Sequence, residues 1–182
     1  MAKHPLMRHG RAWVFGDNIA IDGDLMALEW ALKRETDPVV LRQHVFETLA
    51  PHFSKDVKAG DVVFAGRRFA QGNPHIQGLI GLVGCGVGIV VESIPIGSFR
   101  NALCAGLPML PRCPGITGLV TDADEVSVDF RTGHVMNHTT GIEKEYEPLP
   151  DRLLAYIEVG GWGPIFQRRL DEVGMLRTSA EA

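Results

Sequence analysis

The sequence predicts an α/β fold in which a small parallel core is joined to antiparallel β elements. Between residues 62 and 110, apolar strand-like segments alternate with helix-like segments at short spacing, which is the pattern of right-handed βαβ connections. Between residues 125 and 137, apolar and polar positions instead alternate around a glycine-containing turn, which is typical of a hairpin. We expect residues 1–182 to form a single domain.

The first part of the chain favours one strand and one helix. Residues 11–15 favour a strand that ends at Gly16. A helix is expected to begin at Asp37 and Pro38, because Asp37 can cap the first turn and proline fits that turn. Pro51 would end this helix. Its buried stripe would consist of Leu41, Val45, Phe46 and Leu49.

Three short apolar segments are expected to be the parallel strands, namely residues 62–65, 87–91 and 107–110. The second is apolar throughout, as expected of a strand that is covered on both faces of the sheet.

Two helices are expected to connect these strands. Asn73 is a suitable cap and Pro74 a suitable first-turn residue, so the first connecting helix should begin there and end at residues 84–86, which include two glycines. The second should cover residues 96–105 and stop at Gly106.

The last third of the chain favours antiparallel strands and then helices. Residues 125–130 and 134–137 are the two arms of the predicted hairpin. Two helices are expected at residues 150–159 and 164–173, followed by a frayed end at 177–182.

Composition excludes several functional classes. The formal net charge is −4 with no basic stripe, which argues against a nucleic-acid partner. The longest apolar candidate, residues 79–91, is interrupted by four glycines and is too short to cross a membrane. The first ten residues lack the apolar stretch of a signal peptide. We therefore expect a cytoplasmic protein with no membrane partner.

Three cysteines are present: Cys85, Cys104 and Cys113. An odd number without close pairs argues against a disulfide framework and for a reducing compartment. Three thiolates could in principle hold an iron–sulfur cluster, but the close C-x-x-C pair usual in such sites is missing. We interpret them as buried or idle thiols and expect no metal site within this chain.

The segment at residues 66–75 is the strongest candidate for a functional site. It joins a predicted strand to a predicted helix start, where free backbone N–H groups and the helix dipole attract carboxylates or phosphates. Arg67 and Arg68 precede this point, and His75 would lie just inside the helix. The residues alone leave open whether this is an anion site or merely a well-capped helix.

A second segment, residues 16–24, is rich in aspartate and glycine. It lacks the closing glutamate and the preceding helix of a calcium-binding loop, so a simple turn is the more economical interpretation. Arg100 and Asn101, in the second connecting helix, would by themselves be a surface pair.

Taken in order, these landmarks resemble the small-subunit family of 3-isopropylmalate dehydratase, which includes homoaconitase small subunits and the swivelling domain of aconitase. The resemblance extends from about residue 11 to residue 171. Residues 15–22 are similar to the family's G-D-x-I-D-T-D pattern, and residues 66–72 to its G-x-x-F-G-x-G pattern. Further similarities are to D-P-x-x-L-x-x-H at residues 37–44, to G-V-x-x-V-V-A-x-S-F at 86–93 and to R-N-x-x-x-x-G-L-P at 100–108.

The resemblance implies a swivelling β/β/α domain, as in the C-terminal domain of aconitase. It also implies a partner, a large aconitase-like subunit that carries a 4Fe–4S cluster, so that no cofactor is expected in this chain. The pair would act as a hydro-lyase or isomerase on a small hydroxycarboxylic acid.

Departures from the family pattern fall at the implied active site. The family's Ser-Ser-Arg, with a serine as base and an arginine on a substrate carboxylate, is replaced by Asn73, Pro74 and His75. His75 could act as general base or as a weaker carboxylate donor. Asp22 alone remains of the opening acidic pattern. We therefore predict His75 and Asp22 as catalytic residues.

The remaining predicted site residues surround these two. The family places its substrate-choosing loop at residues 23–36, which are rich in apolar side chains here, so we expect an apolar group on the substrate or closure against the partner. The predicted substrate-binding residues are Leu28, Trp30, Arg68, Gln71, Gly72, Asn73, His75, Arg100 and Asn101.

Several functional hypotheses follow. The complex could act on a divergent substrate with His75 in the chemistry, or perform the usual dehydration with a base from the large subunit. The chain could instead be a catalytically silent homologue that binds and stabilises or regulates a partner. The last hypothesis is a small-molecule binder or enzyme that works without a partner.

Overall fold

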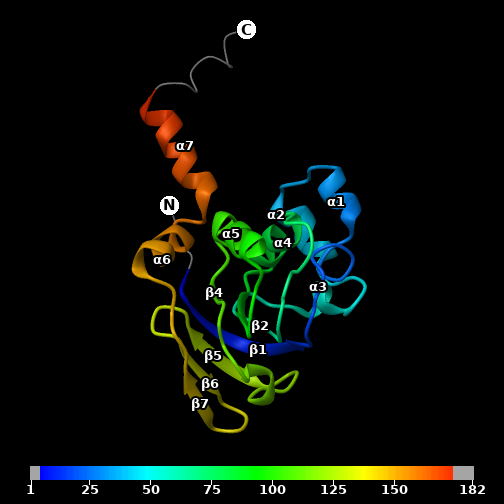
Figure 1. The fold of residues 1–182 in the computed structure, drawn as a ribbon, viewed down its shortest axis with the longest axis vertical. Helices are drawn as coiled ribbons and strands as arrows, with labels where there is room; N and C mark the ends of the chain where they lie inside the picture. The colour runs from blue at the N-terminus through cyan, green and yellow to red at the C-terminus, as the bar shows by residue number, and fades with distance from the viewer. Residues whose placement is uncertain (1–4, 174–182) are drawn as a thin grey trace.

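The computed structural model describes residues 5–173 (Figure 1). Among these residues, seven strands form one sheet in the order β4-β3-β2-β1-β5-β6-β7. The central strand β1 pairs in parallel with β2 and in antiparallel with β5, so it joins two differently built halves. The predicted combination of a parallel core and antiparallel elements is confirmed. The strands are β1 (Met7–Phe15), β2 (Val62–Ala65), β3 (Gly88–Val91), β4 (Met109–Leu110), β5 (Glu125–Asp129), β6 (His134–Asn137) and β7 (Ile142–Glu145).

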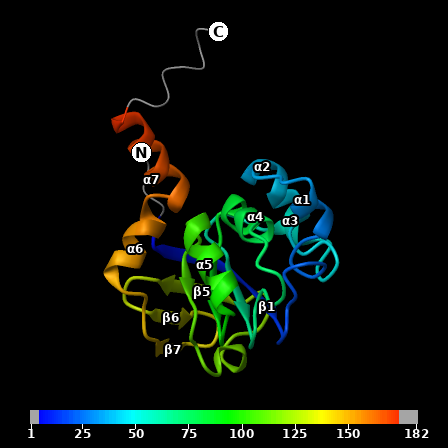
Figure 2. The ribbon, with the colours of Figure 1, turned by 45° about the horizontal axis from the view of Figure 1, so that its top comes forward.

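The parallel half consists of β1 to β4 and the helices over them. Every residue of β2 and β3 is buried, as their apolar sequences predict. Helices α4 (Gln77–Cys85) and α5 (Ile96–Ala105) lie side by side over these strands (Figures 1 and 2). Each helix ends at a left-handed glycine, Gly86 or Gly106, in agreement with the sequence.

The helix predicted from Asp37 to Leu49 is correct only at its start. Asp37 caps α2 (Pro38–Leu41), accepting a hydrogen bond from the Val39 N–H at 2.8 Å. A single 3₁₀ turn, η1 (Arg42–His44), follows, and residues 45–49 then form turns. The reason is tertiary: Phe46 takes a left-handed backbone (φ 58°) that buries its ring between Phe15 and Phe53.

The start predicted for the first connecting helix is also wrong. α4 begins at Gln77 with Ile76 at its N-cap, and Asn73 does not cap it. The left-handed Gly72 (φ 113°) follows Gln71, which is bridged to Ala20 of another loop, so the chain before α4 is held in that loop pairing. His75 therefore lies in the loop before the helix and not inside its first turn.

The antiparallel half is formed by β5, β6 and β7. The predicted hairpin is confirmed: buried and more exposed residues alternate along β5 and β6, and Gly133 (φ 83°) lies in the turn. The third strand, β7, was not predicted because its sequence Ile-Glu-Lys-Glu has no apolar alternation and all four residues are exposed.

The remaining helices lie in the N-terminal third and at the C-terminal end of the described chain. The N-terminal segment adds α1 (Leu28–Leu32) and α3 (Phe53–Asp56), and the two predicted C-terminal helices are α6 (Asp151–Glu158) and α7 (Trp162–Glu172). α7 has no buried residue and projects from the body (Figures 1 and 2). The prediction for residues 177–182 lies outside the described residues. Within residues 5–173, no helix has both the length and the apolar character that a bilayer crossing needs.

Candidate functional site

Two loops that follow neighbouring parallel strands form the candidate site. Residues 16–22 leave β1, and residues 66–75 leave β2. They run side by side with a parallel bridge between Ala20 and Gln71. Backbone hydrogen bonds join Gln71 N–H to the Ile19 carbonyl at 2.9 Å and Ile21 N–H to the Gln71 carbonyl at 2.8 Å. The two segments that the sequence singled out separately are thus one structure, at the edge of the sheet where α/β folds commonly bind ligands.

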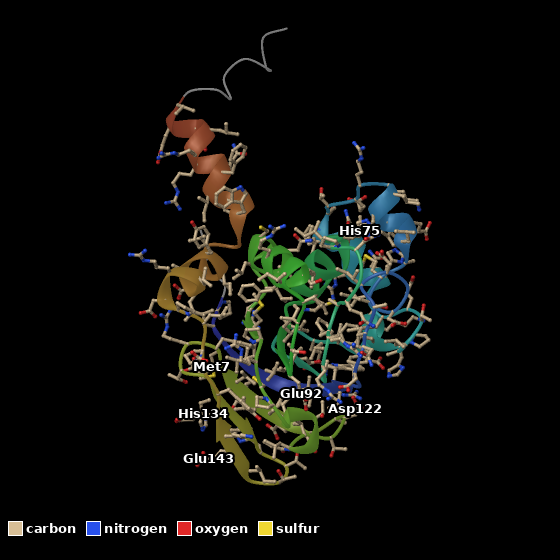
Figure 3. All side chains as sticks on the ribbon, in the orientation of Figure 1. Met7, His75, Glu92, Asp122, His134 and Glu143 are labelled. Carbon is tan, nitrogen blue, oxygen red and sulfur yellow. The ribbon has the colours of Figure 1, made fainter. Side chains whose placement is uncertain are left out.

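Asp22 and His75 form a carboxylate–imidazole pair across these loops. The ring Nδ1 of His75 lies 2.8 Å from Asp22 Oδ1 and 3.0 Å from Oδ2. A carboxylate can only accept, so a neutral imidazole bound in this way carries its hydrogen on Nδ1 and has its lone pair on Nε2. The side chains are 28% and 35% exposed, which leaves the pair accessible to a ligand. Figure 3 marks His75 at the end of the molecule that carries the helices.

α5 supports the loop that carries His75. The Asn101 side-chain amide donates a hydrogen bond to the Pro74 carbonyl. Gly97 lies one turn earlier, and a Cβ there would come within 3.1 Å of Pro74 Cβ. Close packing and a hydrogen bond from the same face of α5 therefore fix the loop next to His75.

The other predicted site residues near this loop differ in accessibility. Gln71 uses its side-chain amide to bind the Asn18 carbonyl at 3.0 Å, so it joins the two loops. Gly72 and Asn73 are exposed beside His75, and Arg100 is exposed on α5. Gly72 and Asn73 are therefore accessible on the same loop as His75.

The predicted specificity segment, residues 23–36, packs against the start of α4. Gln77 donates its side-chain amide to the Glu35 carbonyl at 3.2 Å. The Trp30 ring stacks on His44 with ring centroids 4.2 Å apart, and Lys33 Nζ lies 4.4 Å from the Trp30 ring centroid. Leu28, in contrast, is 44% exposed on α1. Of the two apolar residues predicted to contact substrate, Leu28 is therefore the more accessible.

Arg68 lies in a separate hollow of about 420 Å³ that is also lined by Asp17, Asn18, Arg67 and Ser93. Arg67 forms an ion pair with Asp17, with Nε and Nη2 at 3.1 and 3.0 Å from Oδ2. The Arg67 N–H and guanidinium hold the pKa of the Asp17 carboxyl below its usual range. Arg68 donates from Nε to Asn18 Oδ1 at 2.6 Å and from its backbone N–H to Ser93 Oγ at 3.0 Å.

Backbone strain is concentrated around this hollow. Asn18, Arg68 and Ala70 all have left-handed backbones, with φ of 65°, 58° and 58°. Each such non-glycine residue costs about 1–3 kcal/mol, and strain of this kind persists mainly where function requires it. The sequence analysis missed Asn18 and Ser93 as site residues. The available signal was that a polar residue follows soon after each of the strands β1 and β3.

Metal-ligating side chains do not gather in the part of the chain that the structure describes: no group of three His, Cys, Asp or Glu residues there could hold an ion. Burial raises the pKa of the Cys85 thiol to about 11 and that of Cys113 to about 12. Both thiols are therefore neutral near pH 7, whereas metal ligation requires the thiolate. Cys104 is exposed on α5.

Comparison with known proteins gives a consistent result. No family model matches the chain. The chain is 37% identical over 160 residues to 3-isopropylmalate dehydratase small subunit 1 of Methanopyrus kandleri, covering 87% of this chain and 92% of that one. It is 35% identical over 164 residues to the isopropylmalate/citramalate isomerase small subunit of Methanocaldococcus jannaschii, with coverages of 90% and 95%.

Two further relatives extend the comparison. The methanogen homoaconitase small subunit of Methanothermobacter thermautotrophicus is 36% identical over 153 residues, with coverages of 84% of this chain and 86% of that one. Among solved structures, 3-isopropylmalate dehydratase from Methanocaldococcus jannaschii has a TM-score of 0.75 at 26% identity, covering 93% of this chain and 99% of that chain.

Fold and relatives together define the class of this protein, a small subunit of an aconitase-type hydro-lyase with the swivel-domain fold. More particularly, the chain belongs to the 3-isopropylmalate dehydratase small subunit family. The resemblance drawn from the motifs is confirmed. The relatives favour an enzyme subunit over a catalytically silent homologue.

Proposed function

We propose that this chain works in the cytoplasm with a large aconitase-like subunit, and that the complex dehydrates or isomerises a small hydroxycarboxylic acid. The names of the relatives as small subunits support such a partner. The proposed 4Fe–4S cluster of the large subunit would supply the Lewis acid that binds the substrate hydroxyl. The single observation that carries a catalytic role for this chain is the Asp22–His75 pair in an accessible loop.

His75 replaces the missing serine as the base in this proposal. With Nδ1–H donated to Asp22, the Nε2 lone pair can take the proton from the substrate carbon during dehydration and return it during hydration. Asp22 acts as a positioning residue, because it fixes the tautomer and orientation of the ring. Pro74, at the neighbouring position, has no titratable group and cannot take this role.

Substrate contacts in this proposal come from the surroundings of His75. Gly72 and Asn73 can donate from exposed backbone or amide groups to a substrate carboxylate, and Arg100 is exposed on the adjacent helix. Leu28, exposed on α1, is the candidate contact for an apolar substituent of the substrate. Asn101 and Gln71 hold the loops in place through their side-chain amides.

Reconstitution with the large subunit tests the proposal. The two chains are co-expressed, and the purified complex is assayed with 3-isopropylmalate and with citramalate, the acids in the relatives' names. We expect His75→Ala to lower kcat by about 10²–10⁴-fold, the usual contribution of a general acid–base residue. His134→Ala is the matched control, because His134 also pairs with a carboxylate, Glu143, at 3.2 Å, but lies on β6.

Two readouts separate the outcomes. Gel filtration of each variant complex shows whether assembly is intact, and an unfolding curve shows whether the chain is folded. Full turnover by an assembled His75→Ala complex would remove His75 from the mechanism and leave the base to the large subunit. Failure of the wild-type chain to bind any large subunit would overturn the proposal as a whole.

A further inference from the structure

Two hollows share Ser93 in their lining. The first is the Arg68 hollow described above, at the carboxyl ends of β1, β2 and β3. The second, here called the α5–α6 hollow, has a volume of about 470 Å³ and lies between these helices. Ser93 lines both, so the hollows are adjacent. Five of the eleven residues that line the α5–α6 hollow are large and apolar, namely Ile94, Ile96, Phe99, Leu149 and Leu153.

The Arg68 hollow is lined by two guanidinium groups and one carboxylate, so it has an excess positive charge. Asp17 is engaged by Arg67 through both of its oxygens, and the amide that Arg68 meets at Asn18 is neutral. No acceptor for the terminal nitrogens of Arg68 occurs among the residues that the structure describes. Ser93 Oγ accepts from the Arg68 N–H, which leaves its hydroxyl hydrogen to donate elsewhere. An arginine fork and a hydroxyl together suit a carboxylate.

The α5–α6 hollow suits an uncharged aliphatic group. Its volume is within the range of about 300–1,000 Å³ that small-molecule sites occupy. The charged residues at its rim, Arg112 and Glu147, lie 3.9 Å apart and offset each other. Ile96 is 77% exposed at this hollow, so an aliphatic ligand would remove apolar surface from water there.

α5 contacts both the α5–α6 hollow and the loop that precedes His75. Gly97 and Asn101, one turn apart, face the Pro74 loop that precedes His75. Ile96 and Phe99 point to the α5–α6 hollow from other faces of the same helix. Neither Asp22 nor His75 lines either hollow.

We propose that the two hollows form one binding site for a small carboxylic acid with an aliphatic chain. The carboxylate binds Arg68 and the Ser93 hydroxyl, and the chain lies between α5 and α6. This site does not depend on the proposed catalytic role of His75, and it gives Arg68 a function apart from the reacting centre.

Titration of the full-length chain, without a partner, tests this site. The probes are 4-methylpentanoate, acetate and inorganic phosphate. Their binding is measured through the shifts of backbone amide NMR signals. We expect saturable binding of 4-methylpentanoate, with the largest shifts at residues 93–99 and 66–69, and at least tenfold weaker binding of acetate and phosphate.

Three variants locate the ligand. Arg68→Gln removes the guanidinium, and Ile96→Asp places a charge on an exposed position of the aliphatic wall, so each should weaken binding of 4-methylpentanoate at least tenfold. His75→Ala should leave the affinity for 4-methylpentanoate unchanged. Equal affinity for acetate would overturn the aliphatic half of the site. Loss of binding in His75→Ala but not in Arg68→Gln would place the ligand at the active site and overturn the proposal, without affecting the reconstitution assay.

Discussion

Each half of the molecule contains a histidine paired with a carboxylate, and the two pairs differ in surroundings more than in chemistry. His75 meets Asp22 at 2.8 Å on loops that leave parallel strands, whereas His134 meets Glu143 at 3.2 Å on neighbouring antiparallel strands. The acid is 28% exposed in the first pair and 67% in the second. Figure 3 shows His75 among the helices and His134 with Glu143 on the outer strands of the antiparallel half. The same residue types therefore indicate a site only where the fold holds them in loops beside a ligand-accessible edge.

The halves also differ in how much they bury. β2 and β3 have no exposed residue, whereas β7 has no buried one. A rigid, buried sheet holds the loops that carry Asp22 and His75, because those loops continue directly from β1 and β2. The outer strands of the antiparallel half do not hold the loops of the candidate site. We expect mutations in the parallel half to lower both stability and activity more than comparable mutations in the antiparallel half.

Core truncation should give the largest difference in stability. Phe64 is fully buried in β2, so Phe64→Ala should lower the free energy of unfolding by about 3–5 kcal/mol through lost burial and a cavity. Ile142 is 45% exposed on β7, and Ile142→Ala should stay within about 0.5 kcal/mol of wild type. Urea unfolding measures both changes. Equal losses would show that the antiparallel half is as important to the core as the parallel half.

Buried aspartates give the next comparison. Asp61 is 3% exposed and accepts hydrogen bonds from Arg11 N–H at 2.9 Å, Trp13 Nε1 at 3.0 Å and Lys58 N–H at 3.0 Å. Asp61→Ala leaves these donors unpaired and should cost about 2–4 kcal/mol.

Asp124, near the start of β5, is the counterpart to Asp61. It accepts from Thr121 N–H at 2.8 Å and from the Asn137 side-chain amide at 2.7 Å. With fewer donors left unpaired, Asp124→Ala should cost about 1–3 kcal/mol. A larger loss at Asp124 than at Asp61, in the same unfolding assay, would reverse the expected order of the two halves.

Local sequence signals predicted the parts of the fold that local physics determines. The start of α2 follows from Asp37, and the ends of α4 and α5 follow from Gly86 and Gly106. The course of the chain after His44 does not follow from local signals, because the burial of Phe46 against distant aromatic rings outweighs the helical periodicity.

The candidate site shows the same division. The sequence singled out Asp22 and His75 separately, but their contact spans 53 residues and depends on how two loops are paired. Ser93 was missed because its role appears only when the ends of three strands meet around Arg68. Residue type selects candidates, and tertiary pairing decides which of them act together.

Replacing Asp22 by asparagine tests whether the carboxylate of the first histidine pair matters for catalysis in a way that the carboxylate of the second does not. Asn can donate to Nδ1, which would move the ring hydrogen to Nε2 and remove the lone pair that the proposed base needs. We expect Asp22→Asn to lower kcat of the reconstituted complex by about 10–100-fold, the usual loss when a residue that orients a functional side chain is changed, with KM little affected. Glu143→Gln, on β7, should leave kcat unchanged. A rise in KM alone would instead make Asp22 a substrate contact.

Alkaline pH should lower the stability of the fold gradually, through the two buried thiols. Their pKa values are raised to about 11 at Cys85 and about 12 at Cys113, whereas thiols of an unfolded chain ionise near about 8.5. Above that pH the unfolded state loses protons first, so the free energy of unfolding should fall by about 1.4 kcal/mol per pH unit for each thiol until the folded pKa is reached.

Urea midpoints measured from pH 8 to pH 10 test this dependence. Substituting one thiol at a time separates the contributions of Cys85 and Cys113. Cys85 lies in α4 over the parallel strands, and Cys113 follows β4 beside Tyr146, near the junction with the antiparallel half. Cys85→Ala and Cys113→Ala should each remove about half of the thiol-dependent slope, since each thiol contributes the same amount per pH unit in this range. If only Cys85→Ala flattened the slope, the environment of Cys113 would already be open to solvent before the parallel half unfolds.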